Sequence, residues 1–382
     1  MAHVFQLPTK IVFGTGSINE LGREVLEFKA KKVLVITDPG VVKAELHKGI
    51  IDSLNRSGIE SQVFAEVESD PSIGTAAKAA ELGKEFCADV IVAVGGGSAL
   101  DAAKSAALLV TNSGNLKDFA GVNKVKQPGI PVVAVPTTAG TGSEVTIFAV
   151  MSDPAKNEKF TISSPLIAPR LAVLDPTLTL TLPRGITAST GMDALTHAVE
   201  AYTSTITQPA TDALAMQAIE LISKNLRLAV WRGDNLVARE NVLQASLLAG
   251  IAFNNAFLGL SHAIASPLGA HFHIAHGIAN AVMLPYVMEY NSVTAAGKLA
   301  VVARLMDVND KGLNTRSLAR QAVSAVEELC SDIGIPNRLR DIGVKEDLLP
   351  VVAREALKSV QLKFNARGAS ETDILALLQK AF

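Results

Sequence analysis

The sequence predicts two domains: an α/β domain with a parallel sheet over residues 1–182, then an all-helical domain over residues 183–382. In the first half, short β-branched runs alternate with stretches that carry apolar residues at helical spacing. This pattern is typical of a parallel sheet with helices on both faces. After about Thr181 the strand signals end and long helical segments follow. The stretch Leu182-Pro183-Arg184-Gly185 contains the breaker residues expected at a boundary.

Each element follows from its local pattern. Apolar runs rich in β-branched residues predict strands at 32–37, 62–64, 90–94, 130–135 and 171–174. Helical spacing predicts helices at 42–57, 75–87 and 98–110 in the first domain, and at 211–230, 236–266 and 314–333 in the second. Parallel sheets bind ligands at the carboxyl ends of their strands, so we expect the functional loops of the first domain there.

Composition and charge exclude several classes of partner. The 382 residues carry a net charge of −2 with Lys and Arg dispersed, which argues against nucleic acid or an acidic membrane surface and favours small molecules. Two cysteines, Cys87 and Cys330, are too few for a disulfide framework and fit a reducing compartment. The first residues lack the features of a secretory signal, and no apolar run approaches the ~20 residues of a membrane helix. We therefore expect a cytoplasmic protein.

Four candidate metal ligands occur at two spacings in the helical half. Asp193 and His197 are four residues apart, so on a helix their side chains project from the same face. His262 and His276 are flanked by small residues and would add one imidazole from a helix and one from the next turn or helix start. Each histidine alone is more simply interpreted as a buried or capping residue. The four together are typical of a site for a divalent transition metal such as iron, zinc, cobalt or nickel.

A glycine-rich turn follows the strand at 90–94 and opens the next helix. Its three glycines, residues 95–97, would let backbone N–H groups approach a pyrophosphate, and the helix that begins at Ser98 adds a favourable dipole. A tight connection without a ligand is the alternative. Asp101 lies three residues after Ser98, which predicts a capping box rather than catalysis, and nothing local assigns a role to Lys104.

Two further loops of the first domain carry polar groups at strand ends. Asp38 follows the strand at 32–37, where a carboxylate accepts hydrogen bonds from an adenosine ribose and repels a 2′-phosphate, so it favours NAD over NADP. A turn-forming aspartate is an equally good interpretation. The loop at 136–144 concentrates hydroxyl groups that suit a ribose, pyrophosphate or carboxamide, or only hydrogen bonds within the loop. Gly14-Thr15-Gly16 begins like a dinucleotide fingerprint, but Asn19 replaces the third glycine, so we expect a turn.

Four segments closely resemble the iron-dependent, or group III, alcohol dehydrogenase family. They are GGGSALDAAK (95–104), PTTAGTGSEVT (136–146), LPRGITASTGMDALTHAVEAY (182–202) and GIAFNNAFLGLSHAIASPLGAHFHIAHG (250–277). The resemblance extends over nearly the whole chain. It implies a Rossmann-like α/β domain, an all-α domain, a cleft between them and a homodimer, which is the dehydroquinate synthase-like, or iron alcohol dehydrogenase, architecture.

The resemblance also implies roles for individual residues. The family's metal ligands correspond to Asp193, His197, His262 and His276, and its substrate pocket to Phe148 and Phe253. Its NAD contacts correspond to Asp38, Gly95, Gly96, Gly97, Ser98, Thr137, Thr138 and Ser143. As further cofactor-binding candidates we add Asp101 and Thr141 from the same segments, and Lys159 from a segment that borders the cleft in relatives.

One departure from the family lies close to the expected reaction centre. The family usually has a second histidine four residues after the third ligand, proposed to relay protons, but here Ser266 occupies that position and Pro267 follows. A serine passes a proton only along a chain of hydroxyl groups and water, so Ser266 is our candidate for an altered proton route. His271 and His273 are candidates to replace the histidine, although structural roles are the simpler interpretation. A smaller departure is Asn365-Ala366-Arg367, where Asn-Pro-Arg is common.

These features predict a metal-dependent, NAD(H)-linked oxidoreductase. It would interconvert a small primary alcohol or diol and its aldehyde by hydride transfer, with the metal polarising the substrate oxygen. The expected metal is Fe²⁺, with Zn²⁺ or another divalent metal as alternatives. The competing interpretations are a reductase of an anionic or otherwise functionalised aldehyde, a polyol dehydrogenase or synthase-type relative, and a non-catalytic metal-binding or filament-forming protein. The sequence leaves the substrate, the native metal and the physiological direction open.

Overall fold

The computed structural model describes residues 4–156 and 158–382, which divide into two units. Leu7–Thr181 form the sheet unit, and Leu182–Phe382 together with residues 4–6 form the helical unit. Residues 4–6 join the helical unit through two reciprocal hydrogen bonds, of 2.7 and 3.1 Å, between the Gln6 backbone and the Asn255 side chain. One unit built on a parallel sheet and one built of helices confirm the predicted fold class.

Six parallel strands form the main sheet of the sheet unit. Their order across the sheet is β1 (Lys10–Phe13), β9 (Leu171–Leu174), β6 (Val132–Pro136), β4 (Val90–Gly95), β2 (Lys32–Ile36) and β3 (Glu60–Phe64). β4 and β6 are buried along their whole length, as expected of central strands with helices on both faces. The sequence pattern predicts five of the six strands and misses β1, whose four residues are only partly buried.

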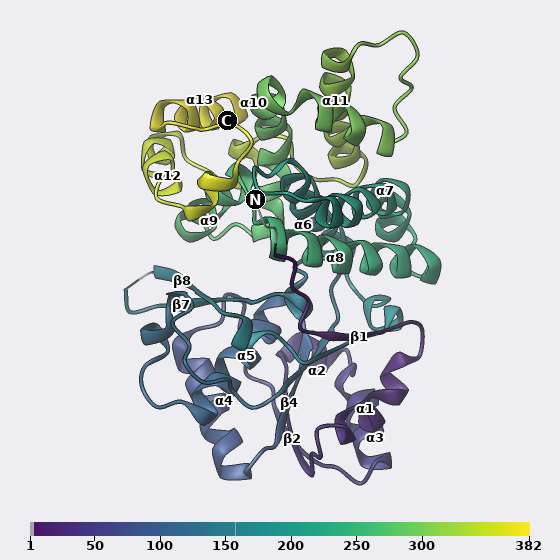
Figure 1. Ribbon diagram of the computed structural model, residues 1–382, viewed down its shortest axis with the longest axis vertical. Coiled ribbons are helices and arrows are strands. Elements are labelled where there is room, and N and C mark those ends of the chain that lie inside the picture. The colour runs from purple at the N-terminus through teal and green to yellow at the C-terminus, as the bar shows by residue number, and fades with distance from the viewer. Residues whose placement is uncertain (1–3, 157) are drawn as a thin grey trace. The chain divides into compact units, whose positions relative to one another are not determined.

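Helices cover both faces of this sheet. They are α1 (Leu21–Leu26), α2 (Pro39–Lys43), α3 (His47–Arg56), α4 (Ile73–Phe86) and α5 (Gly97–Thr111). Successive residues of β2 point to opposite faces, so Val33 and Val35 pack with α1 and α3, whereas Leu34 and Ile36 pack with α4 and α5. The result is a three-layer unit in which the sheet lies between two helical layers (Figure 1).

The predicted helix at 42–57 is wrong as a single element, because the chain breaks it into α2 and α3. Glu45, between the two helices, has a φ of 59°, and this left-handed conformation ends a helix. Apolar spacing continues across the break, so the pattern alone does not detect it. α2 begins instead at Pro39, with Asp38 as its N-cap.

A second, smaller sheet completes the sheet unit. It consists of β5 (Gly121–Val122), β8 (Glu158–Ser163) and β7 (Phe148–Asp153), in that order, with β7 and β8 antiparallel. The sequence analysis does not predict these strands. Exposed and buried positions alternate in β7, although residues 148–151 are all apolar, and β8 starts with two exposed charged residues, so neither has the complete burial of β4 and β6.

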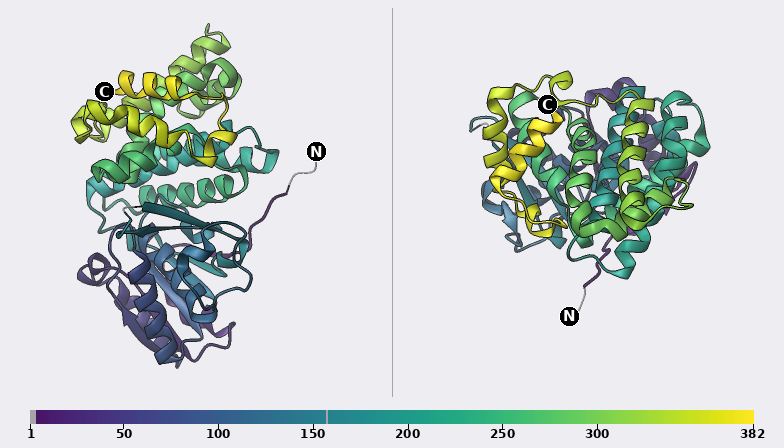
Figure 2. Two further views of the ribbon diagram at one scale, coloured as in Figure 1. Left: turned by 90° about the vertical axis from the view of Figure 1, so that its left-hand side faces the viewer. Right: turned by 90° about the horizontal axis from the view of Figure 1, so that it is seen from above.

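Eight helices form the helical unit over the described residues. They are α6 (Arg184–Thr203), α7 (Pro209–Trp231), α8 (Leu236–Ala256), α9 (Leu260–Phe272), α10 (His276–Leu305), α11 (Thr315–Asp332), α12 (Leu349–Ala356) and α13 (Glu371–Ala381). The bundle appears in teal to yellow in Figure 2. α6 packs against α7, α8 and α10, and every residue from Gly191 to Thr203 is buried. α7 and α11 confirm the helices predicted at 211–230 and 314–333.

The predicted helix at 236–266 is also wrong as a single element. α8 ends at Ala256, and its C-cap Phe257 has φ 58° and ψ −177°, a conformation that a non-glycine residue adopts only under strain. α9 then starts after Gly259, which is its N-cap. The break places His262 in the first turn of a separate helix, so its side chain is directed by contacts at the start of α9.

α8 is the one helix in the described part of the chain that is long and apolar enough to cross a membrane. Its most apolar window has a mean hydropathy of 1.2, and 67% of that window is buried within the structure. A helix that is apolar on several sides and mostly covered by its neighbours is expected in the core of a helical bundle.

Candidate functional site

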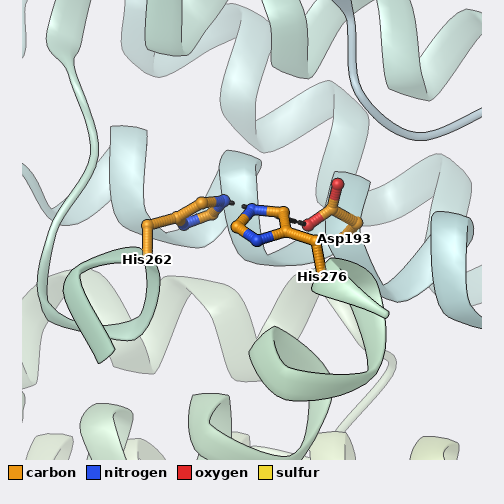
Figure 3. A group of neighbouring side chains, drawn as sticks. All are labelled: Asp193, His262 and His276. Carbon is orange, nitrogen blue, oxygen red and sulfur yellow. Dashed lines mark ion pairs between the residues drawn. The ribbon is translucent and has the colours of Figure 1, made fainter. Parts of the chain in front are cut away.

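The four candidate metal ligands lie together in the helical unit. Asp193 and His197 are one turn apart on α6, His262 is the third residue of α9, and His276 is the first residue of α10. Asp193 Oδ1 lies 3.8 Å from His262 Nε2 and 4.0 Å from His276 Nε2 (Figure 3). Asp193 Oδ2 lies 4.0 Å from His197 Nε2. Ligand atoms bonded to one ion at about 2.0–2.2 Å are separated by up to roughly 4 Å, so these spacings suit a single ion.

His197 forms one wall of this cluster. Its ring stacks on the His262 ring, with centroids 4.6 Å apart, and on the Phe253 ring at 4.4 Å. The side chains of Asp193, His197 and His262 are at most 6% exposed, whereas that of His276 is 48% exposed. The cluster is therefore buried on the side of α6 and α9 and open at His276.

The surroundings of Asp193 and His197 favour the protonation states of metal ligands. Burial lowers the pKa of His197 to about 4, so its imidazole is neutral near pH 7. Burial acts to raise the pKa of Asp193, but His197, His276 and His262 and a hydrogen bond from Asn280 outweigh it, so that pKa lies below its usual value. A neutral imidazole and an ionised carboxylate are the forms that bind a divalent metal.

One buried atom shows that the cluster fits a metal. His262 Nδ1 lies 2.6 Å from the Glu200 carboxylate, which leaves Nε2 to point toward Asp193. Nε2 is buried and has no hydrogen-bond partner among the described residues. An unsatisfied buried polar atom is unfavourable unless a ligand satisfies it. Nε2 faces the Asp193 carboxylate, and the His276 imidazole lies in the same group of possible ligand atoms, with His197 stacked on the His262 ring. Carboxylate and imidazole groups together are a donor set typical of iron or zinc.

The candidate cofactor loops lie at the carboxyl ends of β2, β4 and β6 in the sheet unit. The strand order reverses between β2 and β4, because β3 lies beyond β2 and β6 beyond β4. Open α/β sheets bind ligands at such a switch point. Asp38 follows β2, and its Oδ1 accepts a hydrogen bond of 3.0 Å from Val41 N at the start of α2. Its Oδ2 faces Gly95, where an added Cβ would lie only 2.9 Å away.

The glycine turn is packed closely against the loop at 136–143. Gly95 has a φ of 150°, which disfavours any side chain. A Cβ at Gly97 would lie 2.8 Å from the Thr141 side chain, and one at Gly96 would lie 3.3 Å from that of Thr138. The backbone of Thr137 donates a hydrogen bond of 3.0 Å to Gly95 O. The two loops therefore form one surface above the sheet.

This surface exposes the start of α5. Gly96 is the N-cap of α5 and offers no side-chain cap, and Ser98 is the second, half-buried residue of the helix. The first N–H groups of an α-helix have no partner within the helix and favour an anion.

The predicted capping box between Ser98 and Asp101 is wrong. Asp101 Oδ1 accepts a hydrogen bond of 2.6 Å from Ser143 Oγ, and its Oδ2 accepts one of 2.9 Å from Val150 N. Asp101 therefore fixes the loop that carries Ser143 and the strand that follows it. Its partners are 42 and 49 residues away in the sequence, so local spacing could not reveal them.

Lys104 is completely buried and binds the loop that carries Ser143. Its Nζ donates to Ser143 Oγ at 2.7 Å, Phe148 O at 2.8 Å, Thr146 O at 3.2 Å and Thr146 Oγ1 at 3.3 Å, and lies 3.8 Å from Asp101 Oδ1. Burial lowers the pKa of Lys104 to about 8 and raises that of the neighbouring Glu144 to about 7. A buried ammonium group that binds acceptors on one loop keeps that loop in a single conformation.

The remaining predicted residues have diverse surroundings. Phe253 stacks on His197 in the helical unit, whereas Phe148 begins β7 in the sheet unit. Lys159, on β8, forms an ion pair of 2.8 Å with Asp70. Ser266 is exposed, and its hydroxyl donates a hydrogen bond of 3.1 Å to His262 O.

The two candidate replacement histidines are placed at the end of α9. His271 lies 2.9 Å from Glu355 of α12, and His273 is an exposed residue that ends α9 with a φ of 54°. Both placements agree with the structural roles that were their simpler interpretation.

Two residues next to the ligands escape the sequence analysis, and a third, Asn365, is noted there only as part of a departure from the family. Glu200 contacts His262, and Asn280 Nδ2 lies 2.8 Å from Asp193 Oδ1 and 3.1 Å from His276 Nε2. Asn365 binds the backbone at the start of α9. Helical spacing contains part of this signal: Glu200 is seven residues after Asp193 and Asn280 four after His276, so each shares a face with a ligand.

Comparison with known proteins assigns the family. The iron-containing alcohol dehydrogenase model matches residues 8–176, and the C-terminal model of the Fe-containing alcohol dehydrogenase family matches residues 187–382. The chain is 43% identical to 1,3-propanediol dehydrogenase of Klebsiella pneumoniae, over 99% of this chain and 98% of that protein. It is 37% identical to the NAD-dependent methanol dehydrogenase of Bacillus methanolicus, over 99% of both.

Solved structures agree with this assignment. The crystal structure of a 1,3-propanediol oxidoreductase, 43% identical, superimposes with a TM-score of 0.98 over the full length of both chains. The chain therefore belongs to the iron-containing alcohol dehydrogenase family and is an oxidoreductase that interconverts alcohols and aldehydes.

Proposed function

We propose that this oxidoreductase uses NAD(H) and one divalent metal ion, Fe²⁺ in the cell, to interconvert a small primary alcohol or diol and its aldehyde. The metal would be held by Asp193, His197, His262 and His276. The observation that carries the proposal is the buried, unpartnered Nε2 of His262, which faces the Asp193 carboxylate. Zn²⁺ would fit the same donor set and is expected to replace Fe²⁺ after aerobic purification.

When bound, the metal acts as a Lewis acid on the substrate oxygen, and the nicotinamide accepts or supplies the hydride. The protein's own residues determine the charge and the packing around this site. Asp193 supplies a negative charge in a buried site, and the ring of Phe253 stacks on His197 beside it. Phe148 and Phe253 are our candidates for residues of the substrate pocket. Their apolar side chains would favour small uncharged substrates.

The loops at the strand ends would bind NAD(H). We assign the ribose to Asp38 and the pyrophosphate to residues 95–98. There the first N–H groups of α5 form the positive end of the helix dipole. The hydroxyl-bearing residues of the second loop would complete the site. They are Thr137, Thr138, Thr141 and Ser143. Asp101 would act by holding Ser143, and Lys159 is retained as a cofactor-binding candidate.

The preference for NADH over NADPH is expected to depend on the charge of Asp38. In Asp38→Asn, the amide oxygen keeps the cap on Val41 N, so the loop is preserved while the repulsion of a 2′-phosphate is lost. We expect the ratio of kcat/KM for NADPH to that for NADH to rise about 10- to 100-fold, since like-charge contacts are worth a few kcal/mol. Asp38→Gly should relax the preference too, with added loss of the cap.

Asp89→Asn is the matched control for this change. Asp89 is another carboxylate of the sheet unit, and it accepts hydrogen bonds from the backbone of Lys31 and Lys32 at the start of β2. Its substitution should leave the NADPH to NADH ratio unchanged. A wild-type enzyme that uses both cofactors equally would contradict the assignment of Asp38.

Ser266 would pass the substrate proton along hydroxyl groups and water. Its hydroxyl donates to His262 O, and because a serine hydroxyl does not titrate near neutral pH, Ser266 contributes no ionisation of its own there. Ser266→His is expected to introduce a new ionisation into the pH profile of kcat between about pH 6 and 8, the range in which imidazole titrates. A raised KM with an unchanged pH profile would show that Ser266 only makes room for the substrate.

A substrate panel tests the proposed reaction. NADH oxidation would be measured with the Fe²⁺-loaded protein and short aldehydes of three kinds: unsubstituted, hydroxylated and anionic. We expect the highest kcat/KM for an unsubstituted or hydroxylated aldehyde, as the names of the 1,3-propanediol and methanol dehydrogenases would suggest. The highest value for an anionic aldehyde would favour the alternative function. Lack of activity with all three kinds would reject the proposal.

We also infer a cytoplasmic homodimer. Cys87 is exposed and Cys330 buried, and both are free, which suits a reducing compartment. The dimer follows from the family resemblance.

A further inference from the structure

A carboxylate from α6 holds the start of α9. Glu200 is seven residues after Asp193 and three after His197, so all three side chains lie on one face of α6. Glu200 is only 4% exposed. A buried carboxylate is unfavourable unless it is fully hydrogen-bonded, so its partners indicate what it does.

Glu200 binds two backbone groups and one ligand side chain. Its Oε1 accepts a hydrogen bond of 2.6 Å from Ser261 N, and its Oε2 accepts one of 3.0 Å from Gly259 N. Oε2 also lies 2.6 Å from His262 Nδ1. α9 has no side-chain cap of its own, because its N-cap is Gly259. The carboxylate of Glu200 therefore takes the place of that cap from a neighbouring helix.

These partners determine the tautomer of His262. A backbone N–H can only donate, so both oxygens of Glu200 act as acceptors, an arrangement that favours the ionised carboxylate. The hydrogen bond between His262 Nδ1 and Oε2 then places a proton on Nδ1 and leaves Nε2 as the ring nitrogen that can bind a metal. This is the atom that faces Asp193 Oδ1 at 3.8 Å.

A second side chain fixes the same turn. Asn365 Oδ1 accepts a hydrogen bond of 3.2 Å from Leu260 N, and Asn365 exchanges hydrogen bonds of 3.0 and 2.9 Å with the side chain of Asn291. An added Cβ at Gly259 would lie 2.7 Å from Asn365 Oδ1 and 3.2 Å from Glu200 Oε1. The turn is therefore enclosed between the two side chains, but Glu200 is the one that also binds the ligand ring.

We propose that Glu200 is a positioning residue that sets the metal affinity of the site by fixing the tautomer and placement of His262. The inference rests on the proposed function, because it takes the cluster to be a metal site. A carboxylate behind a ligating imidazole orients the ring and raises its basicity, and loss of such a partner typically weakens metal binding about 10- to 100-fold.

The test is Glu200→Gln in the full-length protein. The glutamine has the same shape, but its NH₂ group must face either a backbone N–H or His262 Nδ1–H, so one donor opposes another. Metal-free protein would be titrated with Zn²⁺ against a chelator of known affinity. We expect the Kd for Zn²⁺ to rise about 10- to 100-fold. Glu200→Asp keeps an ionised acceptor and should recover part of the affinity.

Asn365→Ala is the matched control. It removes an anchor of the same turn without touching His262, so it should lower the Tm of the metal-free protein and leave the Zn²⁺ affinity of the folded protein unchanged. If Glu200→Gln lowers the Tm in the same way and leaves the Zn²⁺ Kd unchanged, Glu200 is only a structural residue and the proposal is overturned. A wild-type protein that binds no Zn²⁺ would instead reject the proposed function.

A measurement on the wild-type protein tests the proposal even if the Glu200 variants do not fold. Histidine labelled with ¹⁵N reports which ring nitrogen carries the proton. In metal-free wild-type protein we expect His262 to be protonated at Nδ1 only. A proton on Nε2 would overturn the proposal without any substitution.

Discussion

Replacing His262 by alanine is expected to remove the bound metal and, with it, the activity, while the fold persists. His262 contributes one imidazole to the cluster and also packs against the ring of His197. Loss of a Lewis acid that stabilises the transition state by several kcal/mol should lower kcat/KM on the order of 10³-fold or more. Metal content after anaerobic loading with Fe²⁺, activity with NADH and an aldehyde, and circular dichroism would be measured on the same sample.

His271→Ala is the matched control for metal content. His271 lies on the same helix, but its partner is Glu355 of α12. Its substitution should leave one metal per chain. Stoichiometric metal in the His262→Ala protein would show that the cluster has been assigned wrongly.

Replacing Lys104 by methionine is expected to destabilise the sheet unit and weaken NADH binding together. Methionine fills a similar volume but leaves Ser143 and the carbonyl of Phe148 without their donor, and Asp101 without its neighbouring cation. Breaking a buried charged network of this kind typically costs about 3–5 kcal/mol. Because Ser143 would no longer be held, we expect the Kd for NADH to rise at least about 10-fold, the equivalent of about 1.4 kcal/mol. Calorimetric Tm and fluorescence titration with NADH would measure the two effects.

Lys117→Met is the control, because it removes a different lysine of the same unit. Lys117 belongs to the same unit and pairs with Asp153 at 2.6 Å and Glu158 at 2.9 Å, but it is partly exposed. Ion pairs of such solvent-accessible groups contribute little to stability, so the Tm and the NADH Kd should change little. Equal effects of the two substitutions would contradict the role given to Lys104.

The fold class was predictable because its signals are local. Apolar runs such as 90–94 and helical spacing such as that of 314–333 each lie within one element, and they recur in alternation. The helix breaks at Glu45 and Phe257 were not predicted, because both are non-glycine residues with a positive φ, which the apolar spacing around them does not report. β1 and the small sheet were not predicted either: β1 has no buried residue, and β7 and β8 mix buried and exposed positions, so none of them has the fully buried pattern of the central strands.

Of the candidate metal site, the sequence analysis singled out the four proposed ligands. Asp193 and His197 are linked by the geometry of one helix, His262 and His276 were marked by their flanking small residues, and the family resemblance then matched all four. The residues that orient the ligands act across the fold. Glu200 reaches His262 over 62 residues, and Lys104 reaches Ser143 over 39, so no local pattern reports either contact. The same distance in sequence explains why Asp101 was misassigned to a helix cap.

Anaerobic titration of the metal-free protein with Fe²⁺ tests the central claim most directly. Bound iron and the rate of NADH oxidation with a short aldehyde would be measured at each addition. We expect the rate to rise in proportion to bound iron, to level off at one ion per chain, and to fall again when a chelator removes the ion. Full activity in the metal-free protein, or no activity at one bound ion per chain, would contradict a reaction that depends on the cluster of Asp193, His197, His262 and His276.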